Sequence, residues 1–548
     1  MRGIKQVKCL VFICIIFLLP FIFSCNMKKI NYDHYFCYNE SSGITSLDPA
    51  FAKNQSNIWA VHHLYNTLVE TGPEMQVVPS LAKSWTISEN RLTIEFILRD
   101  DVFFHDHPAF PGGKGRNMTA YDVAYSLQRL TDPAVASPGA WIFNGRVDTE
   151  KGFEAVNDTV FRLNLLKPFV QMLGVLSNAY CSVVPKEVVE WKGDAFRKHP
   201  CGTGPFRFFI WEDGQVLLLK KNPLYFERDS MGVRLPYLDG VKISFLSAKA
   251  GEFLEFQQKR LDFMNDIDPA FKDELLTKRG ALHKEWQDKI NLYKHPYLNV
   301  EYLGILVDTS TDIGRTSPLQ NKMLRQAVNY AIDRSKLMLY LRNSIGMPAE
   351  YGFIPPGLPG FDSLLLRGYT YQPELAMNLV KKAGYNEINQ PFIKLFTIPV
   401  YADLANALIK DLNHCGIKAE VEVVQKSVLL TKTANRQLPL FRASWIADYP
   451  DAENFMGLFY SAYPSPPNYT RFANGQFDEL YEKCLTETND SIRVKLYQEM
   501  DRIVTDEAPV VPLWYDEVVN FVQPYISGFK PNALNIPDLR RVKKGVAN

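Results

Sequence analysis

The sequence predicts a large mixed α/β protein, and two observations support this class. Residues 392–424 read as an apolar strand, a helix that stops at Gly416 and an alternating strand, which is the pattern of a β-α-β unit. Elsewhere, amphipathic helices with recognisable ends are followed by short apolar runs typical of buried strands. The chain has 548 residues, of which 46% are hydrophobic, and this is enough for a large core. Its length indicates about three domains.

The N-terminus predicts export. A basic start is followed by an apolar run over residues 9–23, which is shorter than the ~20 apolar residues that span a bilayer. We therefore expect residues 1–24 to be a secretory signal peptide. The run ends at Ser24-Cys25, which resembles a bacterial lipobox, so cleavage is expected before Cys25 and a lipid on its thiol. The alternative is a short anchor helix with an incidental cysteine. No second long apolar segment follows, so we expect the mature protein to be tethered to a membrane and not to span it.

Charge and cysteine content narrow the class further. The chain carries 61 basic and 60 acidic residues, a net charge of +1, so no overall field favours nucleic acid as a partner. Cysteines beyond the lipobox are Cys37, Cys181, Cys201, Cys415 and Cys484. Their number is odd, they are scattered and no C-x-x-C occurs, so we expect mostly buried free thiols, although an exported protein can form a disulfide.

Two helices have clear ends. In residues 118–130, Thr119 is followed at capping-box spacing by Asp122, and apolar residues then recur on one helical face. A second helix begins at Pro373 and ends before Gly384. Both patterns predict helices that pack one face on a core.

The later chain continues the pattern and is interrupted by turn-rich loops. An amphipathic helix around residues 492–503 leads into the apolar strand 508–515. Residues 105–117, 352–361 and 461–469 are rich in turn-forming residues and predict surface loops. Because these loops are too short to be free linkers, we expect domains that share strands and are interleaved.

No catalytic or metal-binding motif is complete. The chain contains no G-x-S-x-G, H-E-x-x-H or G-x-x-x-x-G-K-[ST] pattern. "CGTGPFRF" at 201–208 lacks the third glycine of a dinucleotide fingerprint and is interpreted as a tight turn before a strand. His62–His63 and the pair at 105 and 107 have no Cys or Glu at ligand spacing. We therefore expect no enzyme activity, no metal and no cofactor.

Residues 441–455, "FRASWIADYPDAENF", place charges inside an aromatic segment. A charge near apolar surface is costly unless it pairs, so Arg442 and Asp448 are expected to pair with each other or to await a charged ligand. On an alternating strand, residues six apart share a face, which allows this pair, with Trp445 in the core. Asp448 and Asp451 could also suggest glycoside hydrolysis, but nothing in the sequence places a sugar-sized cleft around them.

The order of landmarks along the chain resembles one family. The landmarks are "SLDPAF", "LYNTLVE", "VPSLAKSWTIS", "FILRDDVFFHD", "MTAYDVAYSLQRL", "GTGPFRFFIWEDGQVLLLKKNPLYF", "LRQAVNYAIDRSKL", "WIADYPDAENF" and "DEAPVVPLWY". They resemble the extracellular solute-binding proteins (family 5) that serve oligopeptide and dipeptide importers of the ATP-binding-cassette (ABC) class. The resemblance covers about residues 35–535, and the long insertion at 107–117 departs from it.

The resemblance implies a periplasmic-binding-protein-like α/β fold with two lobes, a hinge and three interleaved domains. Lobe 1 (domain I) is expected to combine residues 25–65, 191–297 and 516–548. An inserted domain II is expected at 66–190, and lobe 2 (domain III) at 298–515. "NVEYLGILVD" and "VVPLWYDEVV" would be the two strands that cross between the lobes.

The resemblance also implies a function. The protein would be a lipid-anchored monomer on the periplasmic or cell-surface side of a bacterial membrane, which captures short peptides between its lobes. It would deliver them to the permease and ATPase subunits of an importer. Asp448 matches the family's ammonium-binding aspartate. Arg442 matches an arginine near the bound peptide, which pairs with Asp448 in an empty site or meets the ligand carboxylate. Trp445 would form a pocket wall, and Tyr449 completes the expected ligand-binding set.

Three alternatives remain at this point. The same fold could bind a nickel chelate, haem or a murein peptide, although few histidines and no methionine cluster weigh against nickel. A lipid-anchored hydrolase of peptides or glycans is the second alternative, and a surface adhesin or structural lipoprotein is the third.

Overall fold

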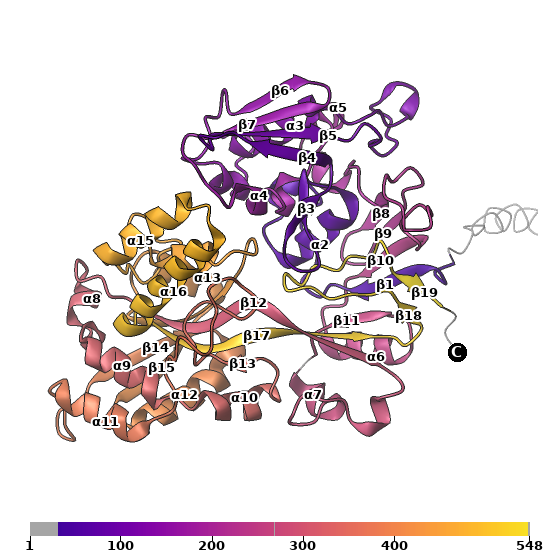
Figure 1. The fold of residues 1–548 in the computed structure, drawn as a ribbon. Coiled ribbons are helices and arrows are strands. Elements are labelled where there is room, and N and C mark those ends of the chain that lie inside the picture. Colours follow the sequence, from indigo (N-terminus) through magenta and orange to yellow (C-terminus); the bar gives the residue numbers. More distant parts are fainter. Residues whose placement is uncertain (1–30, 268, 546–548) are drawn as a thin grey trace, which may run out of the picture.

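Two long antiparallel strands, β12 (Asn291–Ile305) and β17 (Val510–Val522), run through both halves of the molecule (Figure 1). The computed structural model describes residues 31–267 and 269–545, so the expected signal peptide and Cys25 lie outside the described residues. Within those ranges no helix has the length and apolar character needed to cross a membrane.

β12 and β17 lie in the middle of an eleven-stranded sheet. Its order is β15 (Lys418–Val423), β14 (Phe392–Thr397), β16 (Leu440–Ile446), β12, β17, β11 (Phe263–Asn265), β1 (Tyr35–Asn39), β10 (Gly240–Ser244), β9 (Val216–Lys221) and β8 (Phe206–Glu212), with β13 (Met347–Pro348) paired to β17. One sheet therefore serves both halves of the protein.

Lobe 2 is the half that surrounds the end of β12 and the start of β17. Leu303 and Ile305 of β12 point into one core, whereas Val300 and Tyr302 point into a second core on the opposite face. The first face is covered by α9 (Lys322–Ala331), α10 (Arg334–Arg342), α11 (Pro373–Lys382) and α12 (Ala402–His414), and the second by α14 (Glu453–Met456), α15 (Gly475–Thr486) and α16 (Asp490–Glu507). Since both faces are covered, residues 298–305 of β12 are all buried. α8 (Asp312–Thr316) and α13 (Lys426–Ala434) complete the helices of this lobe.

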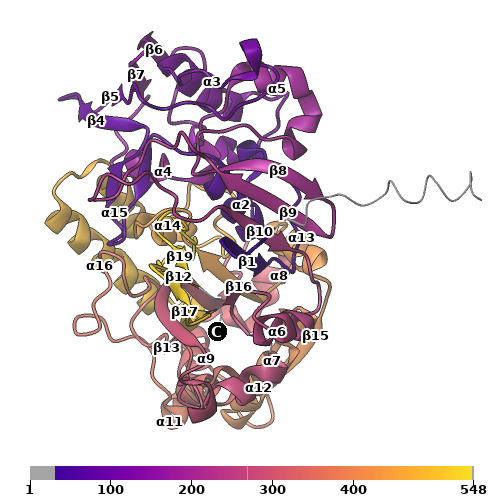
Figure 2. The ribbon, with the colours of Figure 1, turned by 90° about the vertical axis from the view of Figure 1, so that its right-hand side faces the viewer.

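Lobe 1 is the other half, and most of its buried side chains form one continuous core. A separate antiparallel sheet belongs to it, in the order β4 (Ala82–Ile87), β5 (Thr93–Leu98), β7 (Val160–Asn164) and β6 (Phe153–Asn157). Figure 2 shows this sheet, with α3 (Ala120–Thr131) and α5 (Lys186–Lys192), above β8 and β9 of the large sheet. The remaining elements are α2 (Gln55–Leu64), β2 (Val69–Thr71), β3 (Val77–Pro79), α4 (Met172–Val175), α6 (Lys249–Gln257), α7 (Pro269–Leu275), β18 (Ile526–Ser527) and β19 (Lys543–Lys544).

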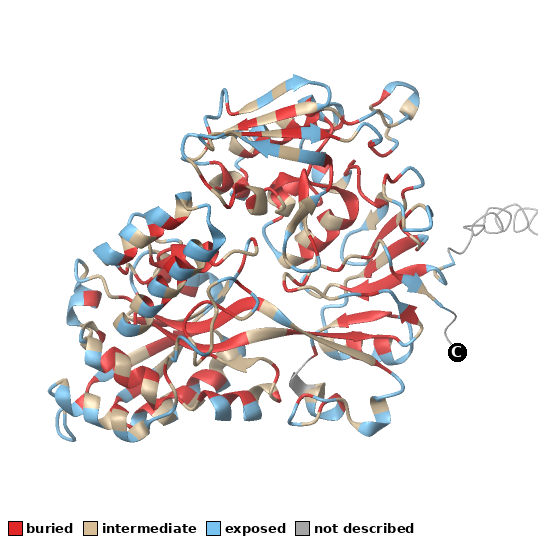
Figure 3. Ribbon diagram, viewed as in Figure 1, coloured by how far each residue is buried: buried red, intermediate tan, exposed pale blue. Residues whose placement is uncertain are grey.

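The crossing between the lobes is the least covered part of β12 and β17. Residues 298–305 of β12 are all buried, whereas Pro296 is exposed and Asp516 and Glu517 are only half-buried (Figure 3). The register of the two strands also shifts between Pro296 and Val300. A two-stranded ribbon with few packed neighbours bends at lower cost than a covered sheet, so this is the part of the two strands that bends most readily.

Several sequence predictions are confirmed. β14, α12 and β15 form the β-α-β unit, with β14 and β15 parallel. At the start of α3, the Asp122 carboxylate accepts the backbone N–H of Thr119 at 2.8 Å, as the capping box requires. The cysteines Cys37, Cys181, Cys201, Cys415 and Cys484 are all buried free thiols.

The inserted loop at 107–117 is held on lobe 1 by charge. Lys114 donates to Asp106 at 2.9 Å. Arg116 pairs with the buried Asp122 and with Glu187, both at 2.7 Å. The loop is therefore anchored at its C-terminal end to α3 and α5.

The glycines of the 201–208 turn allow two backbones to touch. Gly204 accepts no side chain, because a Cβ there would lie 2.3 Å from the carbonyl carbon of Leu64 at the end of α2. The Gly204 N–H donates to the Leu64 oxygen at 2.9 Å. The turn thus fixes α2 against the strand β8 that follows it.

We expect Gly204→Ala to lower the free energy of unfolding by about 1–3 kcal/mol, because the methyl group must displace backbone atoms. Gly475→Ala is the matched control, since a Cβ at this helix start meets nothing within 4 Å. The control should be neutral or up to ~1 kcal/mol more stable. Urea unfolding of both variants measures this, and equal stabilities would contradict the close approach.

Candidate ligand-binding site

Trp445 and Asp448 are held by one side chain, Asn454 of α14. Its Oδ1 accepts the Trp445 indole N–H at 2.9 Å and the Asp448 backbone N–H at 3.2 Å. Its Nδ2 donates to the Asp448 carboxylate at 3.4 Å. β16 ends at Ile446, so the two residues lie where the strand turns toward α14. Asn454 was not predicted from the sequence, because an Asn in a turn carries no signal of its partners.

The Asp448 carboxylate has a perturbed environment. Water reaches the side chain, yet protein atoms surround it on most sides, and this desolvation raises its pKa to about 6, against the hydrogen bond from Asn454. No ion pair to Asp448 is found within residues 31–267 and 269–545. A partly desolvated carboxylate that stays open to water and pairs with no cation is suited to bind one.

Pairing with Asp448 was one of two alternatives for Arg442, and the structure contradicts it: Arg442 pairs with Glu301 of β12. The guanidinium group donates to both carboxylate oxygens of Glu301 through Nε and Nη2. Leu303 lies opposite Arg442 in the ladder, so Glu301, two residues away on β12, shares its face. The alternation that was expected to bring Arg442 and Asp448 together stops because the strand ends before Asp448.

The Arg442–Glu301 pair is buried and stacked. The side chain of Glu301 is 3% exposed and that of Arg442 is 12% exposed. The Arg442 guanidinium carbon lies 3.5 Å from the centre of the Tyr401 ring, which is a cation–π contact. Burial raises the pKa of Glu301, and the charge of Arg442 opposes this rise.

A second charged pair lies at the crossing of the two strands. Arg342 of α10 donates to Asp516 of β17 at 2.5 Å, and Asn299 of β12 donates to the same carboxylate at 3.1 Å. Sequence analysis missed Glu301, Arg342 and Asp516. For Glu301 a signal was present, since it is an isolated acid in the apolar run of β12.

Tyr449 turns away from Asp448 and enters lobe 1. Its ring is 2% exposed and belongs to the lobe 1 core, although the residue lies on a lobe 2 turn. Its hydroxyl group donates to Glu453, which is itself buried. The structure therefore places Tyr449 in the contact between the lobes.

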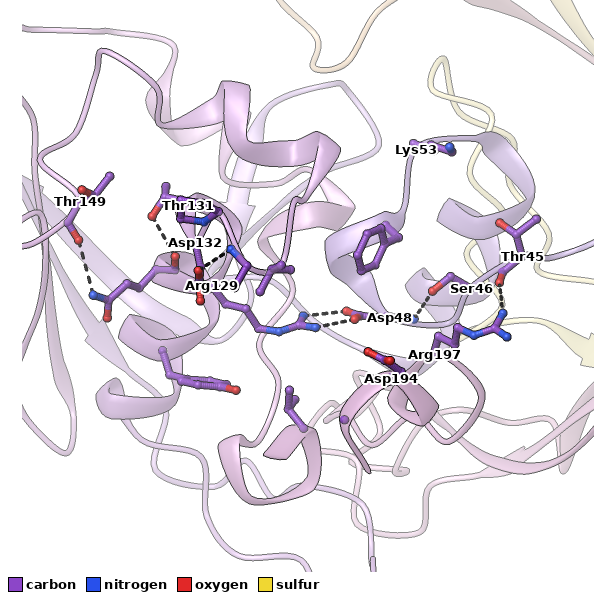
Figure 4. A pocket seen from close by; sticks show the side chains of 18 of the residues that line it. Thr45, Ser46, Asp48, Lys53, Arg129, Thr131, Asp132, Thr149, Asp194 and Arg197 are labelled. Carbon is purple, nitrogen blue, oxygen red and sulfur yellow. Dashed lines mark hydrogen bonds and ion pairs between the residues drawn. The ribbon is translucent and has the colours of Figure 1, made fainter. Parts of the chain in front are cut away.

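A cavity of about 1050 Å³ lies within lobe 1, away from these residues (Figure 4). Across it Arg129 donates to both oxygens of Asp48 at 2.8 and 2.6 Å. Asp48 belongs to the "SLDPAF" landmark. Its ion pair with Arg129 supports the fold of lobe 1. Basic Lys53 and Arg197 line the cavity as well. Besides Asp48, the acids that line it are Asp132, Glu150 and Asp194. Acids and bases are mixed along its wall, so the cavity carries no strong charge of one sign.

We expect Glu301→Gln to lower the free energy of unfolding of lobe 2 by about 3 kcal/mol, because it leaves a guanidinium buried without a counter-charge. Arg442→Leu should cost less, since an unpaired Glu301 can take up a proton whereas arginine cannot lose one. The double variant should cost less than the sum of the two. Urea titration of the four proteins checks this, and additive losses would show that the pair is not coupled.

Comparison with known proteins shows a consistent set of relatives. Over residues 76–466 the chain matches "Bacterial extracellular solute-binding proteins, family 5 Middle". It is 26% identical over 508 residues to "Di/tripeptide-binding protein 2" of Pseudomonas aeruginosa, covering 88% of this chain and 90% of that protein. It is also 26% identical over 486 residues to "Heme-binding protein A" of Haemophilus influenzae, covering 85% and 84%.

A solved structure has the same fold. The periplasmic binding protein DppA of Helicobacter pylori, in complex with the peptide STSA, superposes with a TM-score of 0.77 at 24% identity, covering 93% of this chain and 98% of that one. The two lobes, the shared sheet and the strand ribbon described above are thus those of a periplasmic binding protein. The chain belongs to the bacterial extracellular solute-binding proteins of family 5.

Proposed function

We propose that this protein captures short peptides between its lobes and delivers them to the permease and ATPase subunits of an ABC importer. The observation that carries the proposal is Asp448, a partly desolvated carboxylate without a cation, at the end of β16 where lobe 2 meets lobe 1. A free peptide presents an ammonium group, which matches this site in charge and in hydrogen-bond donors. Relatives described as di/tripeptide-binding and as a complex with STSA support the ligand class.

Each predicted site residue has a role in this proposal. Asp448 receives the ligand's ammonium group, and Trp445, fixed by Asn454, forms a wall for ligand side chains. Arg442 is already neutralised by Glu301, so it contributes a donor to the ligand carboxylate only through its remaining N–H groups. Tyr449 acts at the contact between the lobes.

The proposed domains follow the same division. Domain I comprises residues 25–65, 191–297 and 516–548, the inserted domain II residues 66–190, and domain III residues 298–515. The separate four-stranded sheet, from Ala82 to Asn164, supports domain II.

The proposed receptor is a monomer, and it releases its ligand without catalysing a reaction on it. The proposed function is tested by incubating the purified protein with a mixture of short peptides, after which mass spectrometry should detect the peptides intact. Accumulating cleavage products would identify a hydrolase, and a haem absorption band after purification would identify a haem carrier.

Asp448→Asn should weaken the binding of a free peptide at least ~10-fold, because a hydrogen bond to a charged group contributes about 1.5–3 kcal/mol and the ammonium loses its partner. Wild-type protein should bind the N-acetylated peptide poorly, and the variant should lose that discrimination. Calorimetry of both proteins with both peptides measures this, with Asp490→Asn, an exposed acid of lobe 2, as control.

The pH profile provides a second readout of the same carboxylate. Ammonium binding requires ionised Asp448, and its pKa is raised to about 6. Affinity should therefore fall as the pH drops below about 6, where Asp448 takes up a proton, and fall again above about 8, where the ligand's α-amino group loses one. Asp448→Asn should flatten the acidic part of this profile. If acetylation costs the same affinity in wild type and variant, Asp448 is not the ammonium site.

The lipid anchor at Cys25 is proposed from the sequence alone. Metabolic labelling with a radioactive fatty acid should mark the wild-type protein and should not mark Cys25→Ser, since only the thiol can carry the thioether-linked lipid. Cys37→Ser, the next cysteine along the chain, is the control and should label like wild type. If Cys25→Ser is labelled as strongly as wild type, Cys25 does not carry the lipid.

A further inference from the structure

One segment of lobe 1, residues 169–181, reaches across to lobe 2 along its whole length. We call it the strap; it contains α4 and the short helix η5 (Ala179–Cys181). At its N-terminal end the Val170 N–H donates to the Leu485 oxygen at 3.3 Å. Next to it, Gln171 Nε2 donates to the Tyr497 hydroxyl at 3.1 Å. Both partners lie on the lobe 2 helices α15 and α16.

The middle of the strap receives the Tyr449 ring. A Cβ on Gly174 would lie 3.9 Å from this ring, so the glycine leaves room for a close but unstrained contact. The ring is 2% exposed there, and its hydroxyl group remains bonded to Glu453 of its own lobe. Tyr449 therefore fills a place in lobe 1 without leaving its own lobe's hydrogen bonds. Withdrawing it would expose the ring to water.

The C-terminal end of the strap contacts the candidate site itself. Asn178 Nδ2 donates to the backbone oxygen of Asp448 at 3.1 Å. Tyr180 is close enough for the Asp448 carboxylate to add to the rise in its pKa, which is mainly due to burial. The strap therefore binds the backbone of Asp448, the residue whose side chain is proposed to bind the ammonium group.

Two features allow the contact between the strap and lobe 2 to open. Gln171 Oε1 is buried, and in the described chain it has no hydrogen-bond partner. Burying such an acceptor is unfavourable, so the contact gains less than its area suggests and can open. The β12–β17 ribbon, which also connects the lobes, permits this because it is thinly covered at Pro296 and Asp516. Further contacts between the lobes lie beside it, among them the hydrogen bond from Asn343 at the end of α10 to Asp273 of α7 at 2.7 Å.

We propose that residues 169–181 form a closing strap, in which Asn178 and Gly174 of lobe 1 lock the Asp448–Tyr449 turn of lobe 2 and so determine how long a ligand stays bound. Asn178 and Tyr449 are positioning residues that act through Asp448. Because Asp448 and Tyr449 are adjacent, a ligand held by the first orders the second for insertion. Only the retention of ligand rests on the peptide-binding function proposed above; the locking of the lobes does not.

Hydrogen–deuterium exchange tests the lock without any ligand. Asn178→Ala should raise exchange in two segments together, residues 169–181 of lobe 1 and 447–454 of lobe 2, about 2- to 10-fold, the range for one hydrogen bond. Asn117→Ala is the matched control, because its amide also donates to a backbone oxygen, that of Asp100 at 3.3 Å, but entirely within lobe 1. A purely local role for Asn178 would raise exchange in the strap alone and would overturn the proposal.

Ligand kinetics test the second part of the proposal, the retention of a bound ligand. With Ala-Ala-Ala as probe, Asn178→Ala should speed dissociation about 2- to 10-fold and leave association within about twofold, because the lock forms after encounter. The preference for the free over the N-acetylated probe should persist, since Asp448 is intact. An unchanged dissociation rate overturns the retention step. Failure of wild type to bind the probe counts against the proposed function, while the exchange experiment still decides the strap.

Tyr449→Phe separates packing from hydrogen bonding. It keeps the ring against Gly174 and removes only the bond to Glu453, so exchange across the strap should remain close to wild type. Tyr449→Ala removes the ring and should open both segments more than Asn178→Ala does, provided that its thermal unfolding confirms a folded protein. If Phe opens the contact as much as Ala, the inserted ring is not what locks the lobes.

Discussion

The pairing of β12 with β17 is the constraint on which the rest of the structure depends. The ladder runs from Asn291 opposite Val522 in lobe 1 to Gly304 opposite Val510 in lobe 2, with register shifts on the way. Other strands of the large sheet add outward from this ribbon on either side. Because backbone hydrogen bonds hold the ribbon together, it keeps the two lobes in a fixed register at the crossing. Rotation of one lobe against the other costs least where the ribbon is thinly covered.

Ion pairing divides the charged residues near the β12–β17 crossing into those that are neutralised and those that are not. Glu301 cancels the charge of Arg442, and Asp516 does the same for Arg342. Asp448 has no ion pair in the described chain. The buried Glu453 beside it accepts hydrogen bonds from Tyr449 and Tyr481, and its charge adds to the rise in the pKa of Asp448. The turn after β16 therefore presents negative charge. Such a site can recognise a cationic end group while leaving the rest of a ligand weakly specified, which suits a receptor for many related molecules.

Much of the fold could be predicted from the sequence because its signals are local. The cap at Thr119, the stop at Gly416 and the apolar run of β17 each depend on neighbours within a few residues. The partner of Arg442 could not be predicted, because Glu301 is distant along the chain and the contact depends on the register of β12 against β16. The burial of Tyr449 in lobe 1 could not be predicted for a similar reason. Its insertion into lobe 1 follows from how the lobes meet, and periodicity within a segment does not determine that.

The buried thiols described above bear on how this protein tolerates its surroundings. Burial raises the pKa of Cys415 to about 11 and those of Cys37 and Cys484 to about 12, so in the folded protein these thiols stay protonated and unreactive. Among the described residues these cysteines form no disulfide. Each thiol also becomes reactive only when its own element opens. The rate at which an alkylating reagent modifies each thiol therefore measures local opening at separate points in both lobes.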